Sequence, residues 1–267
     1  MKRKTLALLA LAALAFTATG CKMLKARDNL NKGVQAYRNA QYAQAVEKFE
    51  QAVQLDPTFP TARLYLAMAY YSQYIPGAES PENQQMADRA LQEFEKVLQQ
   101  DSKNDIATKS IASLYFNERK WADAEQWYKK AIALNAKDKE GYYTLGVIAW
   151  SKWYRPWAEA RAKLSMRPED PGPIKDKKVK EELKAQYLPM INEGIQNLQK
   201  ALEIDKDYDD AMAYMNLLIR ERADLDDTQE EYKKDVQTAD DWVQKTLQTK
   251  KMKAERKPTS TGINASQ

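Results

Sequence analysis

The chain has 267 residues, and its 42 Lys and Arg against 38 Asp and Glu give a net charge of +4. Lys2, Arg3 and Lys4 carry three of these charges, so the rest of the chain holds only +1, too little to indicate binding to nucleic acid. There is no histidine and no GxGxxG or GxxxxGK[ST] pattern, so we expect no catalytic or metal site, no cofactor and no small-molecule substrate.

Residues 1–20 have the pattern of a secretory signal peptide. The three basic residues precede an uncharged apolar stretch, Leu6 to Ala18, that is too short to span a bilayer as a helix. The only cysteine, Cys21, follows this segment directly. One alternative is an ordinary signal peptide cut after Ala15, but it would leave Cys21 as an unpaired thiol in an oxidising compartment.

The stretch Ala18-Thr19-Gly20-Cys21 resembles the lipobox of bacterial lipoproteins, although Ala18 stands where Leu is usual. The resemblance implies that Cys21 carries lipid, that residues 21–28 form a short lipidated tether, and that the membrane is reached through the lipid alone. Lys22 after the cysteine, rather than Asp, resembles the choice that sorts lipoproteins to the outer membrane. We therefore expect a cell-envelope protein at the outer membrane, facing the periplasm.

A repeat of 34 residues follows. Small residues recur at this interval in three pairs, which are Gly33 and Ala67, Ala90 and Ala124, and Ala112 and Gly146. Triplets of a small, a large apolar and a second small or branched residue recur with the same internal spacing, at Ala45-Phe49-Ala52, Ala90-Phe94-Val97, Ala124-Tyr128-Ala131 and, more loosely, Gly194-Leu198-Ala201. This period predicts a helical-repeat protein.

These residues closely resemble the tetratricopeptide repeat (TPR), in which small residues let two antiparallel helices approach and an aromatic residue packs against the next repeat. The resemblance implies an all-α, helix-turn-helix solenoid of about four to five repeats over residues 29–249. Two insertions interrupt the pattern, near residues 72–82 and 151–188. The second is expected to extend both helices of repeat four into an arm, with Pro189 kinking or breaking the returning helix.

The last repeat is predicted at Asp209–Ala223, followed by a partner helix from about Glu230 to Lys253. Its outer charge would close the exposed end of the solenoid. Residues 250–267 begin with a basic run and end in a polar stretch, and we expect this tail to be disordered.

The inward positions of the first helices supply the candidate partner-binding residues. In this family they line a concave surface, and here they indicate an apolar, aromatic groove for an extended or helical segment. The alternative is that these rings are simply buried between repeats. The candidates in the groove are Tyr37, Met68, Tyr71, Phe116, Tyr143 and Trp150; in the last repeat the same positions hold Ala213, Leu217 and Arg220.

Trp153 and Trp157 lie three and seven residues after Trp150, at the start of the arm. Tryptophan gathered on one helical face is typical of interface anchors, so we expect these two to bind a partner as well. The alternative is that they hold the arm against the solenoid.

The sequence thus favours a lipid-anchored scaffold that binds protein partners in the envelope as an assembly or docking factor. A second hypothesis is a structural or cell-wall-associated envelope protein without a specific peptide groove. A third, an enzyme, would have to work with carboxylates such as Asp209 and Asp210, but adjacent acids in a connecting turn are usually helix caps.

Overall fold

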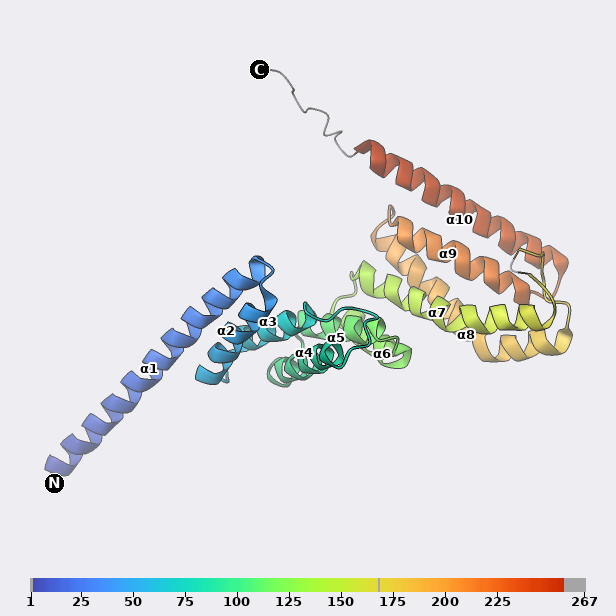
Figure 1. The fold of residues 1–267 in the computed structure, drawn as a ribbon. Helices are drawn as coiled ribbons and strands as arrows, with labels where there is room; N and C mark the ends of the chain where they lie inside the picture. The colour runs from blue at the N-terminus through green and yellow to red at the C-terminus, as the bar shows by residue number, and fades with distance from the viewer. Residues whose placement is uncertain (1, 168, 257–267) are drawn as a thin grey trace, which may run out of the picture. The chain divides into compact units, whose positions relative to one another are not determined.

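The computed structural model describes the backbone of residues 2–167 and 169–256, and the side chains from residue 20 onward in those ranges. All regular structure in the described part is helical, which confirms the all-α prediction (Figure 1). The helices are α1 (Lys2–Arg38), α2 (Tyr42–Leu55), α3 (Pro60–Tyr71), α4 (Pro81–Gln100), α5 (Asp105–Asn117), α6 (Trp121–Leu134), α7 (Lys139–Lys163), α8 (Lys177–Ile204), α9 (Asp209–Arg222), the 3-10 turn η1 (Ala223–Leu225) and α10 (Gln229–Arg256).

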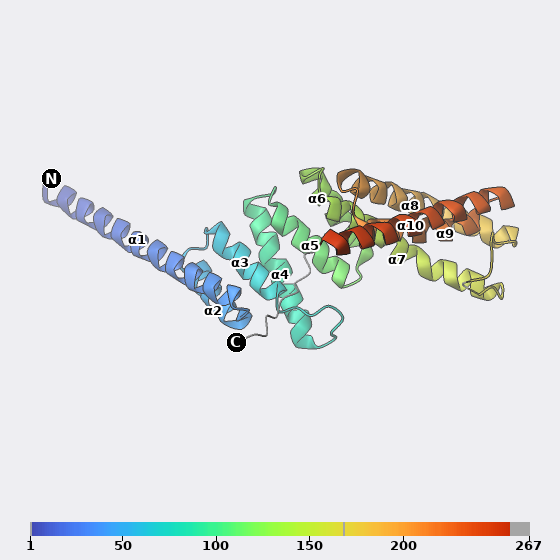
Figure 2. The same cartoon turned by 90° about the horizontal axis from the view of Figure 1, so that it is seen from above.

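The chain divides into two compact units, Met1–Trp127 and Tyr128–Gln267, with the boundary inside α6. In unit 1, α1 packs on α2 and α3 on α4; in unit 2, α7 packs on α8 and α9 on α10. Figure 2 shows the four helices of unit 2 lying side by side. Each unit is therefore a stack of helical hairpins.

Small residues stand where paired helices approach most closely. A Cβ atom added to Gly33 would lie 2.4 Å from the Phe49 ring, and one added to Gly146 would lie 2.4 Å from Leu198. Gly194 makes a similar approach, since its Cβ would be 2.5 Å from that of Ala149. The residues predicted from spacing to admit a partner helix do so in both units.

The recurring triplets form the cores. Ala45, Phe49 and Ala52 of α2 are fully buried in unit 1, as are Ala90 and Phe94 of α4. In unit 2 the looser triplet ends with Leu198 and Ala201, which are also fully buried. These positions fill the space between stacked helices, as the repeat pattern requires.

Three helices that begin a hairpin, α1, α5 and α7, are each followed by a residue in the left-handed conformation. Ala40, Arg119 and Ser165 have φ values of 57° to 58°. At each, the next amide donates to a carbonyl five residues back, at 2.9 Å for Gln41 N to Ala36 O. This is the Schellman arrangement, which usually has glycine at the left-handed position. Residues with a Cβ atom occupy it here at a cost of about 1 kcal/mol each.

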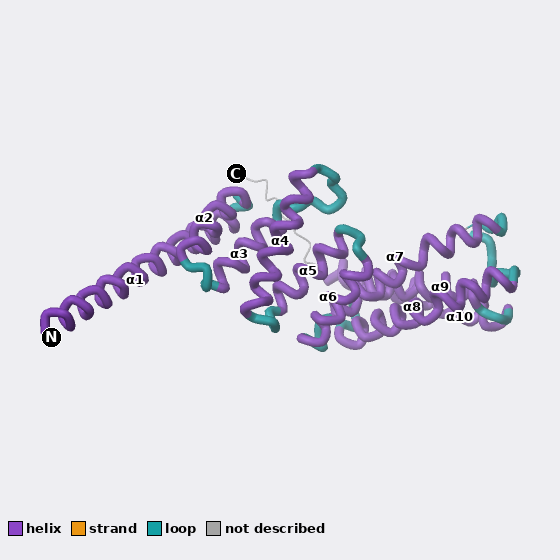
Figure 3. Tube along the Cα trace, turned by 90° about the horizontal axis from the view of Figure 1, so that it is seen from below, coloured by secondary structure: helices purple, strands orange, loops and turns teal. Residues whose placement is uncertain are grey.

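The two predicted insertions take different forms, and Figure 3 shows their loops as teal segments. Residues 72–80 form a loop between α3 and α4, braced by the buried Asn83. The Asn83 side chain accepts from Ile75 N at 2.7 Å and donates to Ile75 O and Ala78 O. The second insertion lengthens α7 and α8 and joins them through residues 164–176, which agrees with the predicted arm.

Two boundaries differ from the sequence-based expectation. Residues 21–28, expected to form a short link before the first helix, lie within α1. Residues 250–256, expected to be disordered, lie within α10, while the rest of that predicted tail, residues 257–267, is outside the described residues. Both stretches are rich in Lys, Arg, Ala and Met, which favour helix, and basic residues at the end of α10 complement its dipole.

The prolines do not end their helices. Pro156 lies inside α7, and Pro189 lies inside α8, which continues as one helix to Ile204. A proline in a helix interior costs about 3 kcal/mol. Burial of Trp153 and Trp157, which flank Pro156, offsets that cost in α7, since an aromatic side chain of this size contributes about 4 kcal/mol when buried.

Candidate partner-binding surfaces

In unit 1, the predicted groove tyrosines tie neighbouring repeats together. The Tyr37 hydroxyl lies 2.8 Å from Ser72 Oγ, at the end of α3. The Tyr71 hydroxyl lies 2.7 Å from Ser113 Oγ of α5 and accepts from Asn117 Nδ2 at 3.2 Å. Both tyrosines are half-buried, and the hydroxyl of each forms its hydrogen bond with the first helix of the next repeat. Their hydroxyls therefore serve the stacking of repeats.

The other two candidates in unit 1 are also half-buried. Met68 packs against the unit 1 core, and the Phe116 ring lies edge-on to Trp121 with 5.5 Å between centroids. Part of each side chain stays accessible, so they offer a narrow apolar surface.

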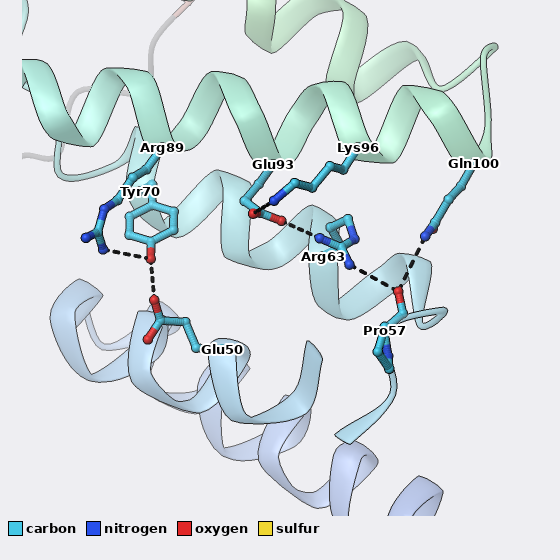
Figure 4. Close-up of polar contacts among 8 residues, drawn as sticks. All are labelled: Glu50, Pro57, Arg63, Tyr70, Arg89, Glu93, Lys96 and Gln100. Carbon is cyan, nitrogen blue, oxygen red and sulfur yellow. Dashed lines mark hydrogen bonds and ion pairs between the residues drawn. The ribbon is translucent and has the colours of Figure 1, made fainter. Parts of the chain in front are cut away.

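Figure 4 shows a second set of hydrogen bonds and ion pairs, which fixes α3 between α2 and α4. The Arg63 guanidinium contacts Glu93 of α4 at 2.6 Å and donates to Pro57 O. The Tyr70 hydroxyl donates to Glu50 of α2 at 2.5 Å. Burial, with the Glu50 carboxylate, raises the pKa of Tyr70 to about 12, so this hydroxyl remains a donor at physiological pH.

Unit 2 carries a larger aromatic cluster on α7 and at α9, which we call the aromatic face. Ring centroids of successive members lie 5.0 to 5.7 Å apart, with the ring pairs tilted or edge-on. Its members are Tyr208, Tyr143, Tyr214, Trp150 and Tyr154. Tyr154 is 45% exposed and the other four are half-buried, so the face is anchored in the unit and open on one side.

The tyrosine hydroxyls of this face differ from those of unit 1. Among the described residues, no hydrogen bond joins the hydroxyl of Tyr143, Tyr208 or Tyr214 to another side chain or to the backbone. Burial raises the pKa of all three, to about 12 for Tyr208, and the Asp210 carboxylate adds to the effect. Each hydroxyl therefore stays protonated and free to donate to a carbonyl of a bound chain.

Trp153 and Trp157 do not belong to this open surface. Trp153 is 0% exposed, and its ring packs on Tyr187 of α8. Trp157 is 9% exposed and its indole nitrogen donates to Asp224 Oδ2 at 2.6 Å. Both rings are buried within unit 2, which favours the alternative that they hold the arm in place.

Asp224 is the centre of a buried polar network that fixes the arm to η1. Its Oδ2 atom accepts from Arg161 Nη1 at 2.6 Å, and both residues are 3% exposed. Arg161 also donates to the carbonyls of Arg167 and Asp170 in the connecting loop, and Ile174 N donates to Asp224 O. The buried ion pair and these three hydrogen bonds to the backbone hold the connecting loop, which the insertion introduces, in one arrangement.

Glu221 lies beside this network, and no cation among the described residues pairs with it. It is 5% exposed, its Oε1 atom accepts from the Trp150 indole at 3.0 Å, and its Oε2 atom has no hydrogen-bond partner among the described residues. Burial raises the pKa of Glu221 to about 7; the Trp150 hydrogen bond opposes this rise and the Asp224 charge adds to it. The carboxyl that supports Trp150 thus titrates near neutral pH.

A cleft opens in unit 1 between the inserted loop and the turn from α5 to α6. Its volume is about 690 Å³. The lining includes Tyr74, Ser80, Gln84, Arg119 and Lys120. Lys120 is paired with Glu118 at 3.1 Å, and Gln84 donates to the same carboxylate. The lining mixes polar and apolar groups and its charges are largely balanced, so no single ligand chemistry is indicated.

Sequence reasoning missed several residues of the aromatic face and the network, namely Tyr154, Tyr208, Tyr214, Arg161, Glu221 and Asp224. The positions assigned inward in the last repeat were Ala213, Leu217 and Arg220. A signal for Tyr214 existed, since it is the one aromatic residue in the sequence of the predicted helix Asp209–Ala223 and directly follows the inward position Ala213. The buried charges gave none, because Arg161 and Asp224 lie 63 residues apart.

Two further observations bear on function. Within residues 2–167 and 169–256, no three His, Cys, Asp or Glu side chains are grouped so as to hold a metal ion. Over the same residues, no helix combines the length and apolar character needed to cross a bilayer.

The stacked hairpins and their close-packed small residues define a TPR-type helical-repeat fold. Residues 37–73 match the family model described as TPR repeat, and residues 83–139 match a second model, described as Tetratricopeptide repeat. These matches support the tetratricopeptide family over that part of the chain. No curated protein matched the sequence.

Solved structures give the same fold. The crystal structure of MamA protein is 15% identical, with 87% of this chain and 96% of MamA covered and a TM-score of 0.57. A MamA structure from Desulfovibrio magneticus RS-1 is similar at 15% identity, 85% and 96% coverage and a TM-score of 0.57. YrrB, described as a TPR protein with an unusual peptide-binding site, is 15% identical over 84% and 90%, with a TM-score of 0.52.

Proposed function

We propose that this protein is a lipid-anchored tetratricopeptide scaffold that docks a protein partner in the bacterial cell envelope. Cys21 is exposed and follows a lipobox-like stretch, which supports attachment through lipid at this residue. Lys22 supports the outer membrane, facing the periplasm, as the location.

The observation that carries partner binding is the aromatic face of unit 2. It joins one exposed ring, Tyr154, to half-buried rings whose hydroxyls have no protein partner among the described residues. Rings held in place lose little entropy on binding, and free hydroxyls supply polar contacts to a backbone. This combination fits a polypeptide segment with apolar side chains, in extended or helical form.

The groove of unit 1 takes a smaller part in this proposal. Tyr37 and Tyr71 use their hydroxyls to join repeats, while Met68 and Phe116 keep a partly accessible apolar surface. These internal bonds favour the second candidate, a structural envelope protein without a specific peptide groove. The two candidates differ in whether a defined protein contacts Tyr154.

The test is site-specific photocrosslinking in intact cells. A photoreactive phenylalanine analogue replaces Tyr154, and the matched control carries it at Gln199, an exposed residue on α8 away from the aromatic face. Docking predicts a discrete crosslinked protein at Tyr154, absent at Gln199 and lost when Tyr214 is also changed to Ala. Equal, diffuse crosslinking at both positions would favour the structural candidate.

The anchor is tested separately by the intact mass of the membrane-extracted protein. The proposal predicts cleavage before Cys21 and a mass increase from diacylglycerol. Replacement of Cys21 with Ala should abolish both changes. An unmodified Cys21 thiol in the wild type would refute lipid anchoring. It would leave the result of the photocrosslinking experiment unchanged.

A further inference from the structure

Charge in unit 1 is divided sharply along the chain. Residues 21–38 contain five Lys and Arg and one Asp, a net charge of +4. Residues 39–127 contain eight Lys and Arg and thirteen Asp and Glu, a net charge of −5. The basic part is the half of α1 that would remain after the proposed cleavage before Cys21, so unit 1 of the processed protein has a cationic end and an acidic body.

The basic end is available to a partner. Lys22, Lys25 and Arg27 are exposed, and none of them forms an ion pair with a described residue. Asp28, the single acid of this stretch, is already paired with Lys32 at 2.7 Å. Three neighbouring cations are therefore not neutralised within the described part of unit 1.

Large apolar side chains accompany these cations. Leu24 is 71% exposed and Met23 is 46% exposed, whereas Ala26 and Leu30 of the same helix are buried. The proposed cleavage before Cys21 would leave these residues in the first turns of the helix. Basic residues interleaved with exposed apolar ones at such a helix end are typical of segments that lie in the headgroup region of a bilayer.

The helix joins this segment rigidly to the repeats. α1 continues without a break from before Cys21 to Arg38, it packs on α2, and its buried side chains include Ala26, Leu30 and Ala36. Figures 1 and 2 both show α1 as one continuous helix that runs from the N-terminus to its contact with α2. A contact made by residues 22–27 therefore sets the orientation of unit 1, which a flexible tether would not do.

We propose that the segment Lys22–Arg27 is a second membrane contact, which docks on an anionic bilayer surface and fixes the orientation of unit 1. The inference rests on the proposed lipid anchor at Cys21, which brings the segment to the bilayer. The acidic body of unit 1 is repelled by the same surface, so the charge division orients the repeats away from it. Anionic phospholipid headgroups supply the complementary charge.

The test uses the processed lipoprotein in vesicles. Lipidation blocks the only native thiol, so the substitution Asn31→Cys on α1 gives a single labelling site. Energy transfer from a dye at this site to labelled headgroups is measured in phosphatidylcholine vesicles, with and without phosphatidylglycerol, at low and high salt. The variant combines Lys22→Gln, Lys25→Gln and Arg27→Gln.

The matched control removes the same charge elsewhere, through Lys175→Gln, Lys177→Gln and Lys178→Gln, all at exposed positions. Docking predicts higher transfer with phosphatidylglycerol, reversed by salt and unaffected in the control. Each basic residue contributes about 1 kcal/mol at such a surface, so the triple variant should lower the docking constant roughly 100-fold. Its transfer should fall to the level seen in phosphatidylcholine.

Equal transfer in both vesicle types, or no change in the triple variant, would overturn the proposal while leaving the anchor intact. An intact mass without lipid on Cys21 would overturn the anchor and this proposal together. A variant with Met23→Gln and Leu24→Gln separates the apolar contribution, because it should lower transfer while salt sensitivity remains.

Discussion

The buried carboxyl of Glu221 makes the stability of unit 2 depend on pH in an unusual direction. Its pKa is about 7 in the folded protein against an ordinary value of 4.5, because burial penalises the charged form. The folded state therefore binds the proton more tightly than the unfolded state. The resulting stability is present below pH 4.5 and is lost as the pH rises through 7.

The substitution Glu221→Gln isolates this effect. Glutamine keeps an acceptor for the Trp150 indole and has no charge to lose, so it imitates the protonated acid. From the two pKa values, the wild type should lose about 2.5 kcal/mol relative to the variant between pH 5 and pH 8. Because Glu221 is 5% exposed, solvent does little to reduce this figure.

The assay is urea unfolding at both pH values, followed by tryptophan fluorescence, since four of the six tryptophans lie in unit 2. The control is Glu181→Gln at an exposed position, and it should change the free energy of unfolding by the same amount at pH 5 and at pH 8. All other titrations are common to wild type and variant and cancel in the difference. A stability difference that stays the same at pH 5 and pH 8 would refute the reasoning.

Three further changes test the packing. Ala40→Gly should stabilise unit 1 by about 1 kcal/mol in urea unfolding, because glycine adopts the left-handed conformation without strain. Gly146→Ala should destabilise unit 2 by about 1–3 kcal/mol, because the new methyl group would overlap Leu198. Asp224→Ala should cost about 3–5 kcal/mol by leaving the Arg161 guanidinium buried without a counter-ion, measured by the same unfolding.

Matched controls keep these results interpretable. Ala43→Gly, at an exposed position inside α2, should destabilise by about 1 kcal/mol, opposite in sign to Ala40→Gly. Ala185→Ser on the exposed side of α8 should change stability by less than about 0.5 kcal/mol. A destabilising Ala40→Gly, a neutral Gly146→Ala or a neutral Asp224→Ala would each contradict the corresponding contact.

Features repeated along the sequence could be predicted from it. The 34-residue interval placed Gly33 and Gly146 at close helix crossings, where Cβ atoms cannot be accommodated. The helix expected at Asp209–Ala223 is observed as α9, and its partner as α10. These features are local in sequence and recur, so each repeat supports the interpretation of the next.

The missed features depend on contacts that the pattern does not encode. The continuation of α1 through Cys21 follows from helix-favouring residues such as Lys22 and Ala26, which carry no boundary signal. The burial of Trp153 depends on how the inserted arm packs on α8. Local helix propensity decided the first outcome and tertiary packing the second, and neither has a sequence period.

Because each helix in the two stacks packs mainly on its neighbours in sequence, few contacts within a stack join distant segments. Such topologies have low contact order, so both stacks should fold rapidly, without a search for long-range partners. Opening should begin at the ends, where a helix has a neighbour on one side only, as α10 has in α9. Amide hydrogens of α10 should therefore exchange earlier than those of α8 and α9, and binding at a terminal helix would slow its exchange with little effect on helices further along the stack.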